Sequence, residues 1–228
     1  MRLVHRDSLA GTIDAVDEAF FLGRRLSKSA REQAAKWIAG RQGKPGSYAD
    51  MFAPTETDFK RGARLFSGET IRTRAGTAHI LGEEACRALI LLDVSLAGVR
   101  QALGRASAGM MSRLRKAREL ASGIYCCGRC SVALWRHLAA GGLETVGPER
   151  LLTAGMKTLK SHRQGGGRWR RFPFYYTLLA LSEIELPSAL REMRYAAPTC
   201  ERFLRRPSRD DPIDRRRRLL AERVLAKC

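Results

Sequence analysis

Apolar residues recur along this chain at intervals of three and four positions, the spacing of one face of an α-helix. Alternation of Val, Ile and Thr with polar residues, which would indicate strands, is almost absent. Short connections between such segments favour antiparallel packing of neighbouring helices. The pattern predicts an all-α fold of about ten helices, at residues 8–22, 29–40, 55–67, 76–92, 94–120, 129–140, 148–162, 173–184, 188–205 and 212–226.

Several of these helices carry a chemical start signal. Ser29 with Glu32 and Thr55 with Asp58 have the spacing of a capping box, in which the hydroxyl accepts from a first-turn amide and the acid returns the contact. Gly147-Pro148 and Asp211-Pro212 place proline at the first helical position, where its missing N–H is no loss. We expect helices to begin at these four places.

The chain has no linker rich in Pro and Ser and no low-complexity tract. We therefore expect one all-α domain over residues 1–228. Residues 101–120 are the poorest in apolar side chains, so a subdomain boundary, if present, is expected there. The four consecutive arginines at 215–218 are expected to form a solvated face of the last helix.

Two distant segments share a pattern: "AAKWIAGRQGKPGSYADMFAPTETDF" at 34–59 and "GMKTLKSHRQGGGRWRRFPFYYTLLAL" at 155–181. Each has a helix ending in Arg-Gln-Gly, a turn with glycine, an aromatic residue (Tyr48 or Trp169), a second aromatic, a proline and a new helix. A unit repeated in this way is typical of stacked helical hairpins, each of which buries its apolar face on the next.

The second copy runs from Gln164-Gly-Gly-Gly-Arg-Trp169 to Tyr176-Thr177-Leu-Leu-Ala180-Leu181. It resembles the repeat of the prenyltransferase and squalene cyclase α/α toroids, in which a Gln/Asp-Gly-Gly-Trp turn leads into a helix with Thr-x-x-Ala-Leu. The resemblance implies helical hairpins in a partial α/α-toroid-like arc, with an aromatic-lined concavity for an apolar or extended ligand. The Asp-x-Asp-Asp motif of the cyclases is absent from this sequence, so the resemblance transfers no catalytic residue.

The aromatic residues after the glycines are the candidate ligand contacts. Successive residues of a helix point about 100° apart, so the five aromatics between 169 and 176 cannot all face one pocket. We expect Phe172 and Tyr176 to point inward together and Trp169 to close the end of the hairpin. The predicted ligand-binding residues are therefore Trp169, Phe172 and Tyr176.

The charge of the chain points to a different partner. Lys and Arg number 42 against 23 acids, a formal net charge of +19, which attracts polyanions such as nucleic acid or an anionic lipid surface. Because 34 of the 42 are Arg, a GC-rich genome is an alternative explanation of the excess. A basic segment without an intervening acid gives the candidate polyanion site: Lys157, Lys160, Arg163, Arg168, Arg170 and Arg171.

No apolar leader follows the basic residues of the N-terminus, so we expect a cytoplasmic protein whose six cysteines are reduced. Cys127 and Cys130 form a Cys-x-x-Cys where a helix is predicted to begin, and His137 follows two helical turns later. The three are candidate zinc ligands, with a further ligand expected from Cys200 or Cys228. An iron–sulfur centre, a redox thiol pair and simple packing cysteines are the alternatives.

His79, Glu83 and Cys86 lie on one helical stripe and could bind a metal or pair a base with an acid. The apolar continuation of that helix favours a core histidine bonded to Glu83 instead. No phosphate-binding loop, Gly-x-Ser-x-Gly or dinucleotide fingerprint is present. Three functions stay open: a helical-repeat binding scaffold with an aromatic concavity and basic rim, a basic nucleic-acid-binding protein, and a small zinc enzyme.

Overall fold

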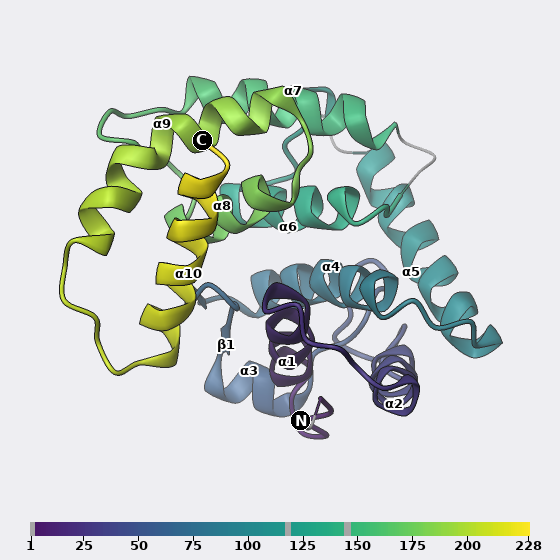
Figure 1. The fold of residues 1–228 in the computed structure, drawn as a ribbon. Helices are drawn as coiled ribbons and strands as arrows, with labels where there is room; N and C mark the ends of the chain where they lie inside the picture. The colour runs from purple at the N-terminus through teal and green to yellow at the C-terminus, as the bar shows by residue number, and fades with distance from the viewer. Residues whose placement is uncertain (1–2, 117–119, 144–146) are drawn as a thin grey trace. The chain divides into compact units, whose positions relative to one another are not determined.

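The computed structural model describes residues 3–116, 120–143 and 147–228. In these residues the chain is all-α, as predicted, and its one sheet is a pair of two-residue strands (Figure 1). The helices are α1 (Leu9–Phe21), α2 (Lys28–Ala39), α3 (Glu56–Arg61), α4 (Arg74–Leu92), α5 (Ala97–Arg115), α6 (Gly128–Ala139), α7 (Pro148–Ser161), α8 (Phe174–Glu183), α9 (Pro187–Leu204) and α10 (Pro212–Ala226), with a short 3₁₀ turn η1 (Leu120–Ser122).

Local signals set most of the helix starts. Thr55 and Asp58 form the predicted capping box of α3, and Pro148 and Pro212 open α7 and α10. The box predicted at Ser29 is wrong. The hydroxyl of Ser27 instead accepts from Ala30 N at 3.2 Å, so α2 begins before Ser29.

Two expected helices are shorter than the pattern suggested. The helix expected at 55–67 ends at Gly62, whose φ of +74° is not helical. The chain then forms strand β1 (Ala63–Arg64), which pairs antiparallel with β2 (Thr70–Ile71). The helix expected at 94–120 spans Ala97–Arg115, and residues 117–119 of that range lie outside the description.

Contacts within the chain divide it into two compact units. Unit 1 comprises residues 1–66, 70–117 and 140–143, and unit 2 comprises residues 67–69, 118–139 and 144–228. The division after residue 117 falls within the segment 101–120, where the apolar content is lowest.

Unit 1 is organised around α4, which packs against α1, α2, α3 and α5. Fourteen of its residues are buried, including the ionisable side chains of His79, Glu83, Glu84 and Arg87. Arg87 forms an ion pair with Asp17 of α1. Burying a charged side chain costs free energy, and a partner of opposite charge close by offsets this cost.

A single carboxylate joins two helix starts in unit 1. Asp58 is 2% exposed. It accepts from Ser8 Oγ at 2.6 Å and Leu9 N at 2.8 Å at the start of α1, and from Thr55 N at 2.8 Å at the start of α3. Since the first amides of a helix lack partners within it, Asp58 satisfies groups of both helices.

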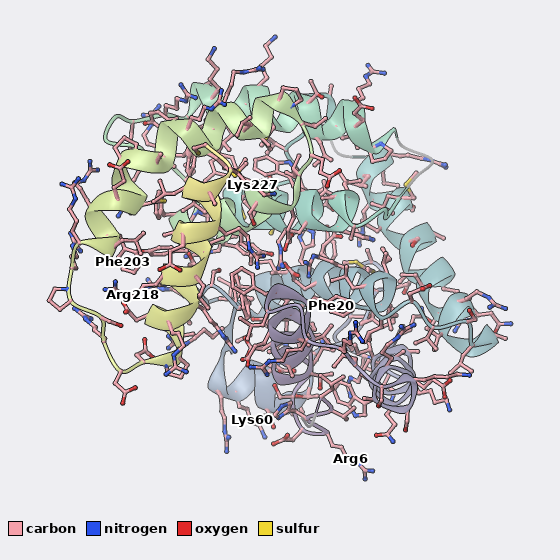
Figure 2. All side chains as sticks on the ribbon, viewed as in Figure 1. Arg6, Phe20, Lys60, Phe203, Arg218 and Lys227 are labelled. Carbon is pink, nitrogen blue, oxygen red and sulfur yellow. The ribbon has the colours of Figure 1, made fainter. Side chains whose placement is uncertain are left out.

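In unit 2, α6 packs against α7 and α8, while α9 packs against α7, α8 and α10. Trp135 of α6 and Tyr176 of α8 are fully buried. At the end of α10, Lys227 Nζ donates to Ser182 O at 2.8 Å, which ties the last turn to α8 (Figure 2).

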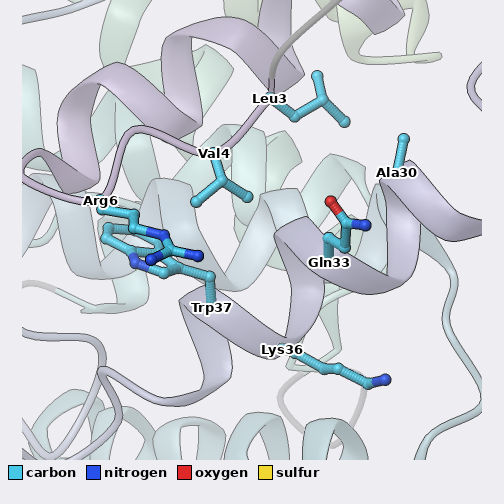
Figure 3. A pocket seen from close by; sticks show the side chains of 7 residues that line it. All are labelled: Leu3, Val4, Arg6, Ala30, Gln33, Lys36 and Trp37. Carbon is cyan, nitrogen blue, oxygen red and sulfur yellow. The ribbon is translucent and has the colours of Figure 1, made fainter.

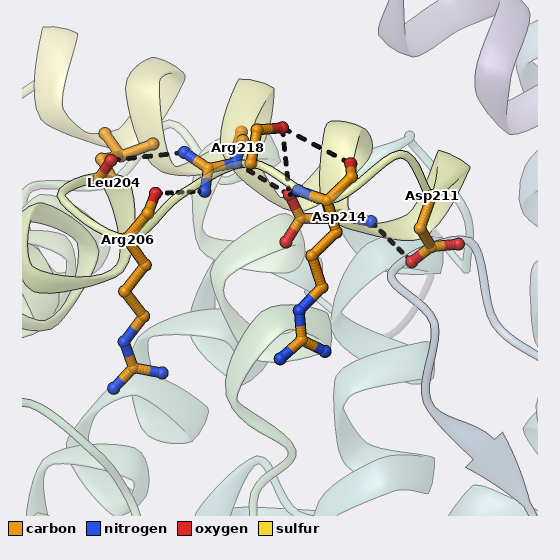
Figure 4. A network of polar contacts seen from close by, with 7 residues as sticks. Leu204, Arg206, Asp211, Asp214 and Arg218 are labelled. Carbon is orange, nitrogen blue, oxygen red and sulfur yellow. Dashed lines mark hydrogen bonds and ion pairs between the residues drawn. The ribbon is translucent and has the colours of Figure 1, made fainter.

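The arginine run of α10 is not simply a solvated face. Arg218 donates to the carbonyls of Leu204 at 3.3 Å and Arg206 at 2.6 Å, and to Asp214 Oδ2 at 2.8 Å, so it holds the connection from α9 to α10 (Figure 4). Its guanidinium also lies 5.3 Å from the ring centre of Phe203 (Figure 2). Arg217 donates to Ser67 O at 2.9 Å.

Each of the two glycine turns is closed by an isolated antiparallel bridge. After α2, Gln42 is bridged antiparallel to Phe52, and after α7, Arg163 is bridged antiparallel to Trp169. Phe52 and Trp169 are both buried. In the first turn Phe52, and not Tyr48, is the residue paired across the turn as Trp169 is in the second.

Candidate functional site

Three thiols meet at the start of α6. Cys127 is the residue before the helix: its carbonyl accepts from Ser131 N at 2.9 Å, and its Sγ accepts from Cys130 N at 3.5 Å. The Sγ atoms of Cys126 and Cys130 lie within 4.8 Å of each other. Cys126 and Cys127 are exposed, whereas Cys130 is buried. The local helix start thus presents one sulfur to the first-turn amides and keeps two more beside it.

The segment before these thiols is anchored to the neighbouring helices. Trp135 Nε1 donates to Gly123 O at 2.7 Å, and Thr158 Oγ1 of α7 donates to Ser122 O at 2.8 Å. Gly123 has φ +70°, and a Cβ there would lie 2.2 Å from Gly155 N, so no larger residue fits. These contacts fix where the cysteines emerge.

Hydrogen bonding divides the three thiols into unlike groups. Hydrogen bonds from the thiols of Cys126 and then Cys130, followed by backbone N–H groups of Cys130 and Arg129, lower the pKa of Cys127 far below its ordinary value. The bond with Cys127 raises the pKa of Cys126 to about 11. Bonds with Cys126 and Cys127, together with burial, raise the pKa of Cys130. Cys127 is therefore the thiolate of the set.

A cavity of about 300 Å³ opens beside Cys127. Its polar and apolar walls come from the start of α6, the end of α7 and the turn before α8: Ser122, Ile124, Cys126, Cys127, Gly128, Thr158, His162, Arg171 and Phe172. His162 Nδ1 lies 2.9 Å from Thr158 O, and its ring meets Phe172 edge-on at 5.3 Å. The cavity thus combines sulfur, imidazole, guanidinium and an aromatic ring.

Arg171 reaches this cavity through an uncommon backbone conformation. Its φ is +67°, in the left-handed region that residues with a side chain rarely adopt. The carbonyl of Arg171 packs against α6, where a Cβ on Gly128 would come within 2.0 Å of it. Glycine at 128 is what allows this approach, and the strained residue sits at the cavity wall.

The predicted polyanion residues are not equivalent in the structure. Lys157, Lys160, Arg170 and Arg171 are exposed, and within the described residues none of the four forms an ion pair. Arg163 instead pairs with Glu192, with Nη2 2.9 Å from Oε1. Arg168 lies over the ring of Phe174 at 4.5 Å. Four of the six cations are available to an anion, and Arg171 alone also lines the cavity.

Most of the predicted ligand-binding aromatic residues lie in the hydrophobic core. Tyr176 is fully buried and Trp169 is 4% exposed, with its indole N–H bonded to Glu192. Phe172 is also buried, stacks on Trp135 with ring centres 5.5 Å apart, and lines the cavity. Of the three, Phe172 is the one that lines this cavity. The ligand role of all three stays a prediction.

The predicted zinc ligands are not brought together as a set. His137 lies seven residues beyond Cys130 on α6, about 10.5 Å along the axis, whereas ligand atoms on one zinc ion lie about 4 Å apart. Among the described residues, no close group of metal-type ligands contains His137. The sequence missed Cys126, whose part in the cluster follows from the turn that precedes the helix and not from helical spacing.

The stripe at His79 in unit 1 forms a core contact. His79 Nε2 lies 3.8 Å from Glu83 Oε1, and both side chains are buried. The imidazole stacks on Tyr48 with ring centres 4.2 Å apart. Burial raises the pKa of Cys86 well above its ordinary value, which makes this thiol unreactive.

Unit 1 has an open cavity of its own, of about 630 Å³ (Figure 3). It is lined by residues of the N-terminal segment and of α2: Leu3, Val4, Arg6, Ala30, Gln33, Lys36 and Trp37. Arg6 and Lys36 give it a basic wall beside the Trp37 ring. The residues of this cavity are scattered singly among polar neighbours, so no pattern in the sequence marks it.

Comparison with known proteins gave no match to a family model, to a curated protein or to a solved structure. In the described part of the chain, no helix combines the length and apolar character needed to cross a membrane.

Proposed function

We propose that this chain is a helical binding protein whose unit 2 holds an anionic ligand in the cavity at the start of α6. The observation that carries the proposal is the placement of Arg171, an exposed cation held at positive φ on the wall of a cavity that also contains His162 and Phe172. A strained residue at such a wall is the kind of feature that function maintains.

The surroundings favour an anion with an apolar part. The N-terminus of α6 faces the cavity, and the dipole and amides of a helix start attract negative charge. Lys157, Lys160 and Arg170 add positive potential nearby. Phe172 and Ile124 offer apolar surface, and the volume of about 300 Å³ suits a small molecule.

The scaffold supports the notion of a repeated hairpin. An antiparallel bridge closes each glycine turn, Gln42–Phe52 and Arg163–Trp169, and in unit 2 α6 packs with α8 and α7 with α9. Such alternation is what stacked hairpins of an α/α-toroid-like arc would give. On this proposal, a ligand-binding site can form at the glycine turn of each copy without a change in the packing of the helices.

Calorimetric titration with 8-anilinonaphthalene-1-sulfonate, an aromatic anion, tests the site. We expect saturable binding of one equivalent, weakened about tenfold by Arg171→Ala because a charge-assisted contact is lost. Arg205→Ala, which removes an exposed arginine of the same unit away from the cavity, is the matched control. Equal weakening by both substitutions would show that the site does not bind the anion.

A parallel measurement distinguishes a small anion from a polyanion. Binding of a 20-base-pair DNA duplex is followed over a salt series, since each phosphate contact steepens the dependence of affinity on salt. A shallow slope unaffected by Lys157→Ala and Lys160→Ala favours the small ligand. A steep slope that flattens in these variants would indicate that the protein binds nucleic acid and not a small anion.

A further inference from the structure

We propose that Cys127 and Cys130 are a thiol–disulfide exchange pair, and that the adjoining cavity admits a small disulfide bearing carboxylates. The second part rests on the anion site proposed above, whereas the first does not. The geometry that carries the pair is the helix start itself, with an exposed sulfur before the first turn and a buried sulfur three residues later.

The two sulfurs are placed as attacking and resolving groups. Cys127 is exposed, borders the cavity and receives the Cys130 amide and thiol as donors, which hold its sulfur as a thiolate. Cys130 is 4% exposed and hydrogen-bonded to Cys127. Residues three apart at a helix start have Cα atoms about 5 Å apart, within the range that a disulfide spans.

The exchange balances without another redox partner. The Cys127 thiolate attacks one sulfur of the substrate disulfide, forms a mixed disulfide and releases the first thiolate. Cys130 then attacks Sγ of Cys127, gives its proton to the departing sulfur and releases the second thiol. The substrate disulfide is reduced to one thiolate, which takes a proton from water, and one thiol, and the protein is left with a Cys127–Cys130 disulfide.

Other cysteines of the chain are less suited to this step. Burial raises the pKa of Cys200 to about 11 and also raises that of Cys228. Cys86 is fully buried. Arg171 and His162, which line the cavity with Cys127, are placed to receive the carboxylates of a disulfide such as oxidised glutathione.

The test exposes the fully reduced protein, without oxygen and with a chelator present, to oxidised glutathione. Peptide mapping is expected to find a Cys127–Cys130 disulfide with two thiols released. Cys130→Ser should stop at one glutathionyl group on Cys127, and Cys127→Ser should slow the reaction about 100-fold. Cys228→Ser is the control with an exposed cysteine removed, and circular dichroism checks that each variant folds; Cys130→Ala replaces the serine variant if needed.

Two substrate disulfides, one anionic and one neutral, test the exchange pair and the substrate site separately. If both parts hold, Arg171→Ala slows reaction with oxidised glutathione but not with neutral bis(2-hydroxyethyl) disulfide. If Arg171→Ala has no effect on either, the anionic substrate is rejected and the exchange pair stands. Glutathionylation of Cys126 or Cys228 in place of Cys127, or a metal ion that stays bound to the cysteines in the chelator, would overturn the pair.

Discussion

The indole N–H of Trp169 donates to Glu192 Oε2 at 2.9 Å, which links the glycine turn after α7 to the middle of α9. The same carboxylate accepts from Arg163 Nε at 3.1 Å and Nη2 at 2.9 Å. Glu192 is 2% exposed. One buried acid therefore fixes both sides of the bridged turn, because Arg163 and Trp169 are the two residues paired across it.

Replacement of Glu192 by Ala should lower the free energy of unfolding by about 3 kcal/mol, because a buried indole N–H and a guanidinium lose their shared partner. Urea unfolding followed by tryptophan fluorescence measures the change. Glu185→Ala, at an exposed position of the same unit, is the control and should change stability by less than about 0.5 kcal/mol. Equal losses in the two variants would contradict the role given to Glu192.

Neighbouring glycines of the turn should respond differently to alanine. Gly166 and Gly167 both have positive φ, but a Cβ on Gly166 meets nothing within 4 Å, whereas a Cβ on Gly167 would lie 2.7 Å from Thr199 Oγ1 and 3.0 Å from Tyr195 O. We expect Gly166→Ala to cost about 1 kcal/mol for its backbone alone. Gly167→Ala should cost about 3 kcal/mol, since the contact with α9 is added.

Thermal unfolding of the two variants side by side measures this difference. Gly166→Ala serves as the internal control because it carries the same backbone strain without the clash. Equal midpoints would mean that α9 does not press on the turn as the structure describes.

Helical periodicity and local capping chemistry were enough to place most helices of this chain. Pro148, Pro212 and the Thr55–Asp58 box act within one turn, so their effect can be read from adjacent residues. The early end of α3 could not be predicted in this way. It depends on positive φ at Gly62 and on pairing with a strand seven residues later, neither of which has a periodic signature.

The candidate site was predictable only in part. The Cys-x-x-Cys spacing indicated that Cys127 begins a helix, and the structure has it there. Positive φ at Arg171 could not be predicted, because it accompanies a close approach of its carbonyl to Gly128, which is distant in the sequence. Nor could the pairing of Phe52 across the first turn be predicted, since the bridge partner is decided by loop closure and not by the shared Arg-Gln-Gly.

Replacement of Asp58 is expected to have a large effect on the stability of unit 1. Asp58→Ala should destabilise unit 1 by about 3 kcal/mol, because amides of α1 and α3 and the hydroxyl of Ser8 lose one acceptor. Glu56→Ala is the matched control: its side chain lies in the same helix turn and is 73% exposed. Hydrogen exchange at the start of α1 reports the loss directly, and unchanged protection there would contradict the shared cap.

The pH dependence of alkylation tests how Cys126 acts on Cys127. The Cys126 thiol is the leading cause of the lowered Cys127 pKa, so the wild-type reaction with iodoacetamide should stay fast as pH falls from 8 to 6. Cys126→Ala removes the donor and moves the midpoint up towards the ordinary thiol value, so alkylation should begin to slow at a higher pH than in the wild type. Cys126→Ser keeps a hydroxyl donor and should preserve the low midpoint, which a purely structural role would not require.

Cys130 and Arg171 are unchanged in both variants, and His162→Gln is the control for the imidazole on the cavity wall. Identical profiles for the alanine and serine variants would show that Cys126 does not set the ionisation of Cys127.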